Sequence, residues 1–71
     1  MERFGEKVYR LRQRRGLSLR KLAAGLGLAT HSHLDRIEKG EDKPSADLIL
    51  KIADFFGVTT DQLMRDELDI E

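Results

Sequence analysis

The chain has 71 residues, no cysteine and a formal net charge of +0, which suffices for one domain and excludes stabilisation by disulfides. Its longest apolar run, residues 22–29, is interrupted by two glycines and is far shorter than the ~20 residues of a membrane-spanning helix, and charged residues follow Met1 in place of a secretory leader. We therefore expect a cytoplasmic single domain that binds no membrane.

The neutral total conceals an uneven distribution of charge along the chain. Residues 1–39 contain ten Lys or Arg and four acids, whereas residues 40–71 contain three bases and nine acids. The two parts therefore carry formal charges of +6 and −6. Because a local cationic surface is sufficient to attract a polyanion, the first part is the candidate surface for nucleic acid. The acidic part is expected to face away from it.

Residues 2–15 are predicted to form the first helix. Phe4, Val8 and Leu11 recur at offsets of four and seven, which places them on one helical face. Gly16 follows as the C-terminal stop. Arg14 and Arg15, in the last turn, either stabilise the helix through its macrodipole or approach a phosphate group.

Residues 19–26 are predicted to form the second helix, with Ser18 as its N-cap and Gly27 as its end. The apolar residues of its buried face are Leu19, Leu22, Ala23 and Leu26. Gly25 lies inside this helix, where glycine costs about 1 kcal/mol relative to alanine. Close packing of another segment against this position would explain it.

The third helix is predicted to begin after Thr30, its N-cap, and to end before Gly40. Leu34 and Ile37 form its apolar seam, and Leu28 in the preceding turn is expected to pack beneath the second and third helices. Together the second helix, the turn and the third helix read as a helix-turn-helix unit.

The face of the third helix opposite its apolar seam carries hydrogen-bond donors. At about 100° per residue, Ser32, Arg36 and Lys39 lie nearly opposite the seam. His31 and His33 lie on its two flanks. A helix about 10–12 Å wide fits the major groove of B-DNA, where the base edges present acceptors. The alternative interpretation is a solvated helix face, which is what most charge-rich helical stripes are.

Ser45 and Gly57 are predicted to bound the fourth helix. Its apolar residues cover more than half of the circumference, which is typical of a central core element. They are Leu48, Ile49, Ile52, Ala53, Phe55 and Phe56.

A capping box of Thr59 and Gln62 predicts a fifth helix over residues 60–67. This helix is expected to turn Leu63 and Met64 inward. The tail after it alternates apolar and acidic residues, and it either frays or takes part in a dimer contact.

These elements predict an all-α, compact five-helix domain over residues 1–67 and a short acidic tail over residues 68–71. From Phe4 to about Met64 the sequence resembles the lambda-repressor-like, Cro-type helix-turn-helix family of small DNA-binding transcriptional regulators. The residues that carry the resemblance are Leu11-Arg12, Gly16-Leu17-Ser18, Leu22-Ala23, Gly27, Arg36-Ile37-Glu38-Lys39-Gly40, Pro44-Ser45, Phe56-Gly57-Val58 and Asp61-Gln62-Leu63.

The resemblance implies functions for individual residues. Arg12 and Glu38 match the family's arginine and glutamate, which pair between the first helix and the end of the third. If this pair is largely buried, removal of one partner costs ~3–5 kcal/mol. The residues implied to read bases are His31, Ser32, His33 and Arg36. Those implied to contact backbone phosphates are Ser18, Arg20, Lys39 and Lys43.

The sequence departs from the family pattern in three places. Gly27 and Ile37 are ten residues apart where the family usually has nine, so the extra residue falls in the turn and shifts the first base-reading position by up to one. Leu19 stands where many relatives have a DNA-contacting glutamine. Glu41 and Asp42 place negative charge in a loop that often approaches phosphate, which weakens the assignment of the lysine beside them.

One helix in one groove reads few base pairs, so we expect a homodimer on a palindromic operator with half-sites about 34 Å apart or a multiple of that distance. Double-stranded DNA is then the partner, and neither a cofactor nor a small-molecule ligand is foreseen. The candidate dimer contacts, each of which also suits an ordinary core, are Phe55, Leu63, Met64, Leu68 and Ile70.

Two other function classes compete with DNA binding. His31, His33 and Asp35 are potential metal ligands, but positions two apart on a helix diverge by roughly 200° and do not converge on one ion. Without a glycine-rich phosphate loop, a cysteine nucleophile or a complete triad, catalysis is not indicated. The stronger rival is a helical protein-interaction module of the same fold that does not read DNA. A repressor, a restriction-modification controller, an antitoxin and a lysogeny switch remain alternatives within the DNA-binding hypothesis.

Overall fold

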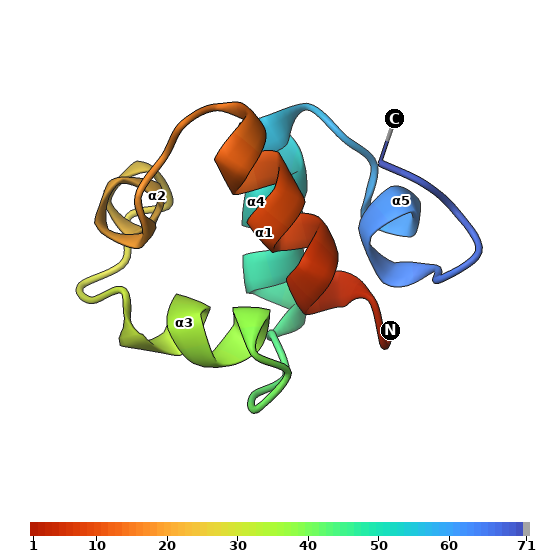
Figure 1. The fold of residues 1–71 in the computed structure, drawn as a ribbon, viewed down its shortest axis with the longest axis horizontal. Helices are drawn as coiled ribbons and strands as arrows, with labels where there is room; N and C mark the ends of the chain where they lie inside the picture. Colours follow the sequence, from red (N-terminus) through yellow and green to blue (C-terminus); the bar gives the residue numbers. More distant parts are fainter. Residues whose placement is uncertain (71) are drawn as a thin grey trace.

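The computed structural model describes residues 1–70, so the last residue of the predicted tail, Glu71, lies outside the described residues. The described chain forms five helices (Figure 1). They are α1 (Phe4–Arg14), α2 (Leu19–Gly25), α3 (Ser32–Glu38), α4 (Ala46–Phe56) and α5 (Thr60–Met64). In Figure 1, α2 and α3 lie to the left of α1, and α5 with the C-terminal segment lies to the right. The prediction of an all-α, five-helix fold is confirmed over this range.

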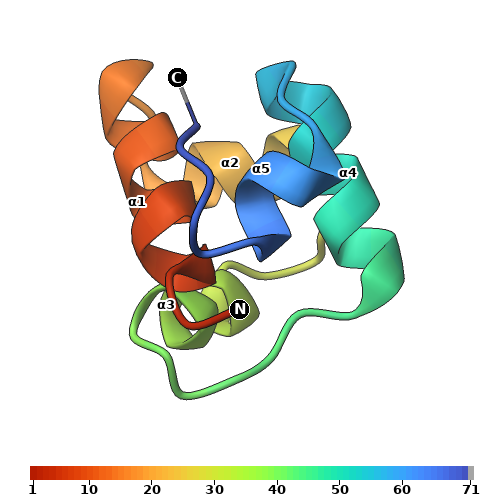
Figure 2. The ribbon, with the colours of Figure 1, turned by 90° about the vertical axis from the view of Figure 1, so that its right-hand side faces the viewer.

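The apolar faces predicted from periodicity meet in one core. α5 lies between α1 and α4 when the molecule is seen from its right-hand side (Figure 2). The buried apolar side chains are Phe4, Val8, Leu11, Leu22, Ala23, Leu26, Leu34, Ile37, Leu48, Ile49, Ile52, Ala53, Phe56, Leu63 and Ile70. Around them pack the partly buried residues Leu17, Leu19, Leu28, Phe55 and Val58. All five helices therefore depend on the same core for their stability.

The N-terminal caps predicted for α2, α4 and α5 are present. Ser18 Oγ and Ser45 Oγ each accept the backbone N–H three residues later, at 3.1 Å. Thr59 Oγ1 accepts the N–H of Gln62 at 3.0 Å, and Gln62 Oε1 accepts the N–H of Thr59 at 2.9 Å. These bonds satisfy helix N–H groups that have no partner within the helix.

The predicted cap of α3 is displaced by one residue. α3 begins at Ser32 with His31 as its N-cap, so the assignment of Thr30 to this position is wrong. The Thr30 hydroxyl still accepts the N–H of Ser32 at 3.1 Å. The difference arises because His31 has φ −95° and ψ −2° and continues the turn, which lengthens the connection between α2 and α3.

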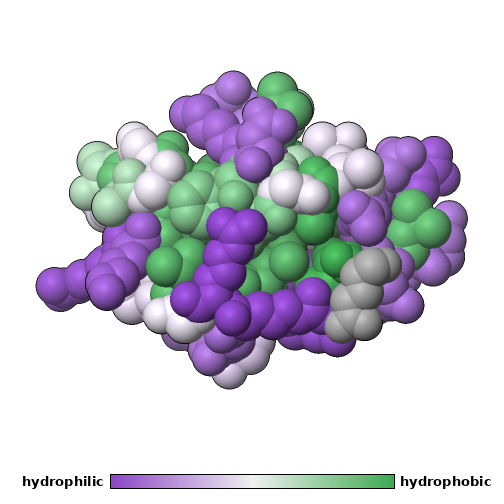
Figure 3. Space-filling model, turned by 90° about the horizontal axis from the view of Figure 1, so that it is seen from above, coloured by the Kyte–Doolittle hydropathy of each residue, from purple (hydrophilic) through white to green (hydrophobic). Residues whose placement is uncertain are grey.

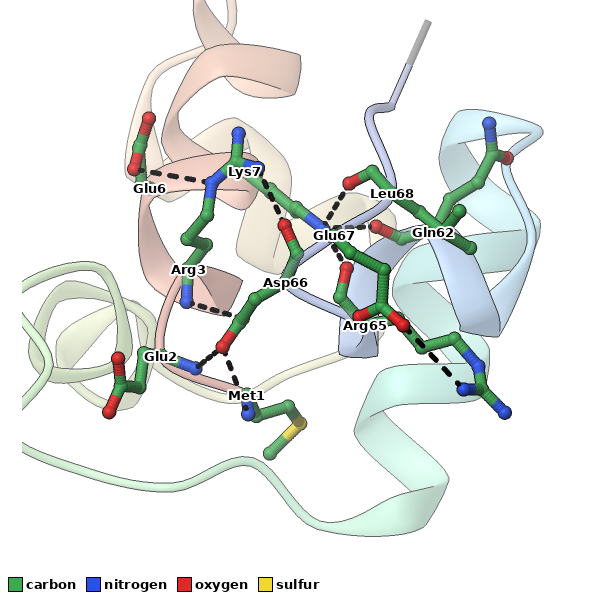
Figure 4. A network of polar contacts seen from close by, with 10 residues as sticks. All are labelled: Met1, Glu2, Arg3, Glu6, Lys7, Gln62, Arg65, Asp66, Glu67 and Leu68. Atoms are coloured by element: carbon green, nitrogen blue, oxygen red, sulfur yellow. Dashed lines mark hydrogen bonds and ion pairs between the residues drawn. The ribbon is translucent and has the colours of Figure 1, made fainter.

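α5 is shorter than the predicted helix over residues 60–67, and a lysine-centred cluster of carbonyl groups follows it (Figure 4). Lys7 is fully buried, and its Nζ donates to the carbonyl oxygens of Gln62, Arg65 and Leu68 at 2.6, 2.7 and 2.7 Å. An ammonium group has three donors, and here each finds an acceptor. The chain after α5 therefore folds back toward α1 instead of continuing as a helix.

Asp66 fastens the N-terminus to the same segment (Figure 4). Its carboxylate accepts the backbone N–H groups of Arg3 at 3.0 Å and Glu2 at 3.1 Å. These hydrogen bonds hold the pKa of the Asp66 carboxyl below its ordinary value. The Arg3 guanidinium in turn donates to the Asp66 carbonyl oxygen at 2.8 Å. The two ends of the described chain are thus joined by polar contacts.

The structure corrects part of the predicted dimer surface. Leu63 and Ile70 are 0% and 6% exposed in the core of their own chain, so they are not accessible to a second copy. Ile70 reaches the core because the C-terminal segment folds back onto the domain. Met64 is 41% exposed, and the prediction that it turns inward is wrong because α5 directs only Leu63 to the core. Leu68 is also exposed.

Candidate nucleic-acid interface

α3 is oriented so that its apolar seam is inside and its donor face is outside. Leu34 and Ile37 are buried in the core, as predicted. Ser32, Arg36 and Lys39 are exposed to solvent on the other side of the helix. The structure therefore leaves an edge of hydrogen-bond donors available to a partner.

A glycine on α1 sets how closely α3 approaches. Gly5 is buried, and a Cβ built on it would lie 2.9 Å from the carbonyl oxygen of Glu38 and closer still to that of Ile37. Only glycine allows the two backbones to come this near without a shift. Periodicity does not identify this role, although a glycine inside a predicted helix is itself a signal of close packing.

An ion pair fixes the C-terminal end of α3 against α1. Arg12 Nε and Nη2 donate to the two carboxylate oxygens of Glu38 at 2.8 and 2.9 Å, and Arg12 Nη1 donates to the Leu17 carbonyl oxygen at 2.9 Å. The two side chains are 10% and 8% exposed. The hydrogen bond to Glu38 raises the pKa of Arg12 above its ordinary value. The pair implied by the family resemblance is therefore part of the structure.

The connection between α2 and α3 reverses at a glycine. Gly27 has φ +74°, a conformation that favours glycine because it has no Cβ. The N–H groups of Gly27 and Leu28 donate to the carbonyl oxygens of Ala24 at 3.1 Å and Ala23 at 2.9 Å, which closes the end of α2. Leu28 is partly buried against the core, as expected. This turn sets the relative position of the two helices of the helix-turn-helix unit.

The cations on α2, at the end of α3 and in the loop after α3 differ in whether they form ion pairs. Among the described residues 1–70, no ion pair involves Arg20, Lys21 or Lys43, and all three are exposed. Lys39 is also exposed, but its Nζ lies 3.1 Å from an Asp35 carboxylate oxygen, and this contact raises the pKa of Lys39. An ion pair between exposed groups is worth about 0–1 kcal/mol, so a phosphate can displace it.

Arg15, at the end of α1, is engaged by α4. Its guanidinium carbon lies 5.5 and 5.0 Å from the ring centroids of Phe55 and Phe56. Its Nη1 donates to the Phe55 carbonyl oxygen at 3.0 Å. The sequence suggests that this arginine either stabilises the helix or contacts phosphate. The structure shows another use, a packing contact between helices that involves Phe55, 40 positions away.

His31 occupies a different environment from the other predicted base readers. It lines a hollow of about 350 Å³ beside α2, and its Nδ1 is buried with no hydrogen-bond partner in the described residues. Arg20 and Thr30 line the same hollow. His31 therefore contributes to the junction of α2 and α3, whereas Ser32 and Arg36 lie on the exposed face of α3.

The loop after α3 brings a carboxylate back to the helix. Asp42 Oδ2 accepts a hydrogen bond from Arg36 Nε at 2.6 Å and lies 3.3 Å from His33 Nδ1. The hydrogen bond from Arg36 lowers the pKa of Asp42, and the same contact raises the pKa of Arg36. The sequence indicates negative charge in this loop, but it does not show that the charge is directed at a predicted base reader.

The described residues also limit other kinds of site. No group of three or more metal-ligating side chains comes together within residues 1–70. No helix among these residues combines the length and the apolar composition needed to cross a membrane.

Known proteins share this sequence pattern and this fold. A family model described as helix-turn-helix matches residues 8–63. The chain is 33% identical over 63 residues to the cryptic phage CTXphi transcriptional repressor RstR of Vibrio cholerae, a match that covers 89% of this chain and 56% of the repressor. It thus spans little more than half the length of that relative. The crystal structure of the restriction-modification controller protein C.AhdI from Aeromonas hydrophila is similar, with a TM-score of 0.78, 32% identity, and coverage of 89% of this chain and 94% of the controller.

Proposed function

Because this chain belongs to the helix-turn-helix family, we propose that it is a sequence-specific DNA-binding transcriptional regulator that places α3 in the major groove of duplex DNA. The observation that carries the proposal is the orientation of α3. Its apolar seam is buried, while Ser32 and Arg36 are exposed on the opposite side. A partner can therefore reach the donor face without any rearrangement of the core.

The proposal assigns two groups of contacts. Exposed donors near the start of α3 and one turn later suit the acceptors on base edges, and cations around them suit phosphate oxygens. The proposed base readers are the exposed Ser32 and Arg36 together with the half-buried His31 and His33. The proposed phosphate contacts are Ser18, Arg20, Lys39 and Lys43. Arg20 and Lys43 have no ion pair to break within residues 1–70, which favours their use against phosphate.

Selection of bound duplexes from a random pool tests the proposal and identifies the operator. The selected duplex and a scrambled duplex are then titrated at several salt concentrations. The three proposed phosphate-binding cations of each subunit are Arg20, Lys39 and Lys43. They predict a slope of about −2.7 in log K against log salt concentration, and about twice that for a dimer. No enrichment of any sequence, together with weak and salt-insensitive binding, would instead identify the protein-interaction module considered as the alternative.

We further propose that the regulator binds as a homodimer on a palindromic operator, with half-sites about 34 Å apart or a multiple of that distance. The candidate contacts that are not buried in the core are Met64, Leu68 and the partly buried Phe55. Seen from above, the face over the C-terminal ends of α1 and α4 has apolar surface at its centre, with hydrophilic side chains that partly cross it and others around it (Figure 3). Such a framed apolar area is typical of an interaction surface.

Sedimentation equilibrium of the wild type and of Leu68→Lys measures the oligomeric state. We expect the wild type to form dimers at micromolar concentration and the variant to remain monomeric with an unchanged unfolding temperature. A Lys51→Glu variant is the control, because Lys51 makes only a local pair with Asp47 at 3.4 Å. A wild type that is monomeric both alone and on the selected duplex would overturn this part of the proposal.

The direction of regulation is proposed to be repression, with the chain acting in the cytoplasm, where bacterial or phage DNA is transcribed. The similarity to a phage protein described as a transcriptional repressor supports this direction. The proposal requires no cofactor, no small-molecule ligand and no catalytic step. A reporter gene placed behind the selected operator should lose expression when the chain is produced, and a gain of expression would reverse the assignment.

A further inference from the structure

Asp42 has a defined position beside α3, and the backbone explains why. Gly40 has φ +78°, and the N–H of Glu41 donates to the Arg36 carbonyl oxygen at 2.8 Å. The N–H of Asp42 lies 3.4 Å from the same oxygen. The loop therefore closes the C-terminal end of α3 at Arg36, and Asp42 of the same loop contacts the Arg36 side chain. The left-handed conformation of Gly40 reverses the direction of the chain, which brings Asp42 back to Arg36.

The contact occupies one part of the Arg36 guanidinium and leaves the rest free. A guanidinium has five N–H donors in a planar fork, of which Nε carries one. Asp42 Oδ2 takes that one at 2.6 Å, and no other hydrogen bond of this group is present within residues 1–70. The four N–H bonds on the two terminal nitrogens therefore remain available, and the plane of the fork is restrained by the carboxylate.

We propose that Asp42 is a positioning residue that holds the Arg36 side chain by its Nε, so that its two terminal nitrogens contact O6 and N7 of one guanine. This inference rests on the proposed function, because it assigns one base to one side chain of a DNA-binding surface. Guanine is the base expected from the chemistry, since its major-groove edge presents two acceptors side by side and matches a bidentate arginine. His33 Nδ1 lies 3.3 Å from the same carboxylate oxygen, so Asp42 contacts two of the proposed base readers.

The physical advantage is a smaller loss of side-chain freedom on binding. A free arginine samples many rotamers, and fixing one long side chain at an interface typically reduces affinity by about 2- to 13-fold. Asp42 imposes that restriction before DNA arrives, but its negative charge lies near the phosphates and weakens all DNA binding. Positioning and charge thus have opposite effects, and they can be separated.

Glu41 supplies the matched control, because it is an exposed carboxylate in the same loop and makes no hydrogen bond or ion pair with its side chain within residues 1–70. The experiment compares the wild type, Asp42→Ala, Glu41→Gln and Arg36→Ala on the selected duplex and on duplexes with single base-pair changes. Fluorescence anisotropy gives the affinity for each duplex at one fixed salt concentration. Thermal unfolding of each variant checks that the fold is retained.

We expect the wild type to prefer guanine at one position by about 5- to 150-fold, and Arg36→Ala to lose that preference. Asp42→Ala should reduce the preference by about 2- to 13-fold while raising the affinity for scrambled DNA. Glu41→Gln should raise the affinity for both duplexes alike and keep the preference. In the Arg36→Ala background, Asp42→Ala should cause no further loss of preference, since the two residues act as a unit.

Two results would overturn the inference. The first is an identical effect of Asp42→Ala and Glu41→Gln, because Asp42 would then act through its charge alone. The second is a stronger preference in Asp42→Ala, because the carboxylate would then mask Arg36 instead of positioning it. A wild type that selects no sequence at all is a separate outcome and refutes the proposed function itself. The Nε–H resonance of Arg36 in the DNA-free protein, slowly exchanging in the wild type and fast in Asp42→Ala, reports on the positioning independently.

Discussion

Substitution of Gly5 by alanine is expected to destabilise the protein, although the same change stabilises most helices. At a helix position without neighbours, alanine is favoured over glycine by roughly 0.5–1 kcal/mol. In this structure the added Cβ would lie 2.9 Å from the Glu38 carbonyl oxygen and nearer to that of Ile37. Both obstacles are backbone atoms of α3, so they cannot rotate away as a side chain can.

The magnitude follows from the distance. Real Cβ atoms are essentially never found below 3.0 Å from a heavy atom, so α1 and α3 have to separate. Overpacking of this kind typically costs about 1–3 kcal/mol, which exceeds the gain in helix propensity. In a domain of 60–100 residues, each kcal/mol corresponds to roughly 4–8 °C in the unfolding temperature.

Gly25 provides a matched control within the same chain. A Cβ at this position would lie 2.6 Å from Cε1 of the Phe55 ring, which is a partly buried side chain and not backbone. We expect Gly25→Ala to be less destabilising than Gly5→Ala. We also expect it to be rescued by Phe55→Leu, which removes the ring, whereas no single side-chain substitution removes the carbonyl groups that face Gly5.

Differential scanning calorimetry and urea unfolding at pH 7 measure these effects. A Gly5→Ala variant with an unfolding temperature equal to or above that of the wild type would refute the reasoning. It would mean that α1 and α3 are not in backbone contact as described. The same variant should also bind the selected duplex more weakly, since a displaced α3 no longer presents its donors in the same position.

Three further predictions concern charged groups. Glu38→Gln should lower the free energy of unfolding by about 3–5 kcal/mol because it leaves the buried Arg12 guanidinium without its charged partner, and urea denaturation of the variant and the wild type measures this loss. Asp66→Asn should be less stable than the wild type at neutral pH. Since folding lowers the Asp66 pKa, the ionised carboxylate favours the folded state, and the difference between the two proteins should vanish as the pH falls below 3.8 through the folded pKa; a difference that persists at low pH would exclude this origin. On DNA, Arg36→Ala should cost about 1–3 kcal/mol at one base position, whereas Lys39→Ala should weaken all sequences alike and reduce the salt slope by about one, and identical behaviour of the two variants on matched and scrambled duplexes would contradict their assignments.

The elements that could be predicted are those whose signals are local. The caps at Ser18, Ser45 and Thr59 each join atoms three residues apart. Gly27 and Gly57 end α2 and α4 through their own left-handed conformation, which needs no distant partner. Periodic apolar residues likewise report which face of a helix is buried. The weakest local predictions were helix ends, such as the Thr30 cap and the C-terminal end of α5.

Contacts between residues far apart in the chain could not be predicted from local signals. Nothing local predicts that Lys7 is buried, because its acceptors are carbonyl groups as much as 61 residues away. The same holds for Arg15, which packs on α4, and for Ile70, which enters the core when the tail folds back. A charged residue on a helix is expected to be solvated unless a partner is known.

For the candidate site, the spacing of apolar residues predicts which side of α3 faces the core and which faces the solvent, because an amphipathic helix has one apolar side. How the exposed residues are held depends on contacts from other parts of the chain. Gly5 lets α1 press against α3, and the turn at Gly40 returns Asp42 to Arg36. These contacts depend on the path of the backbone in space, and side-chain type alone does not reveal that path.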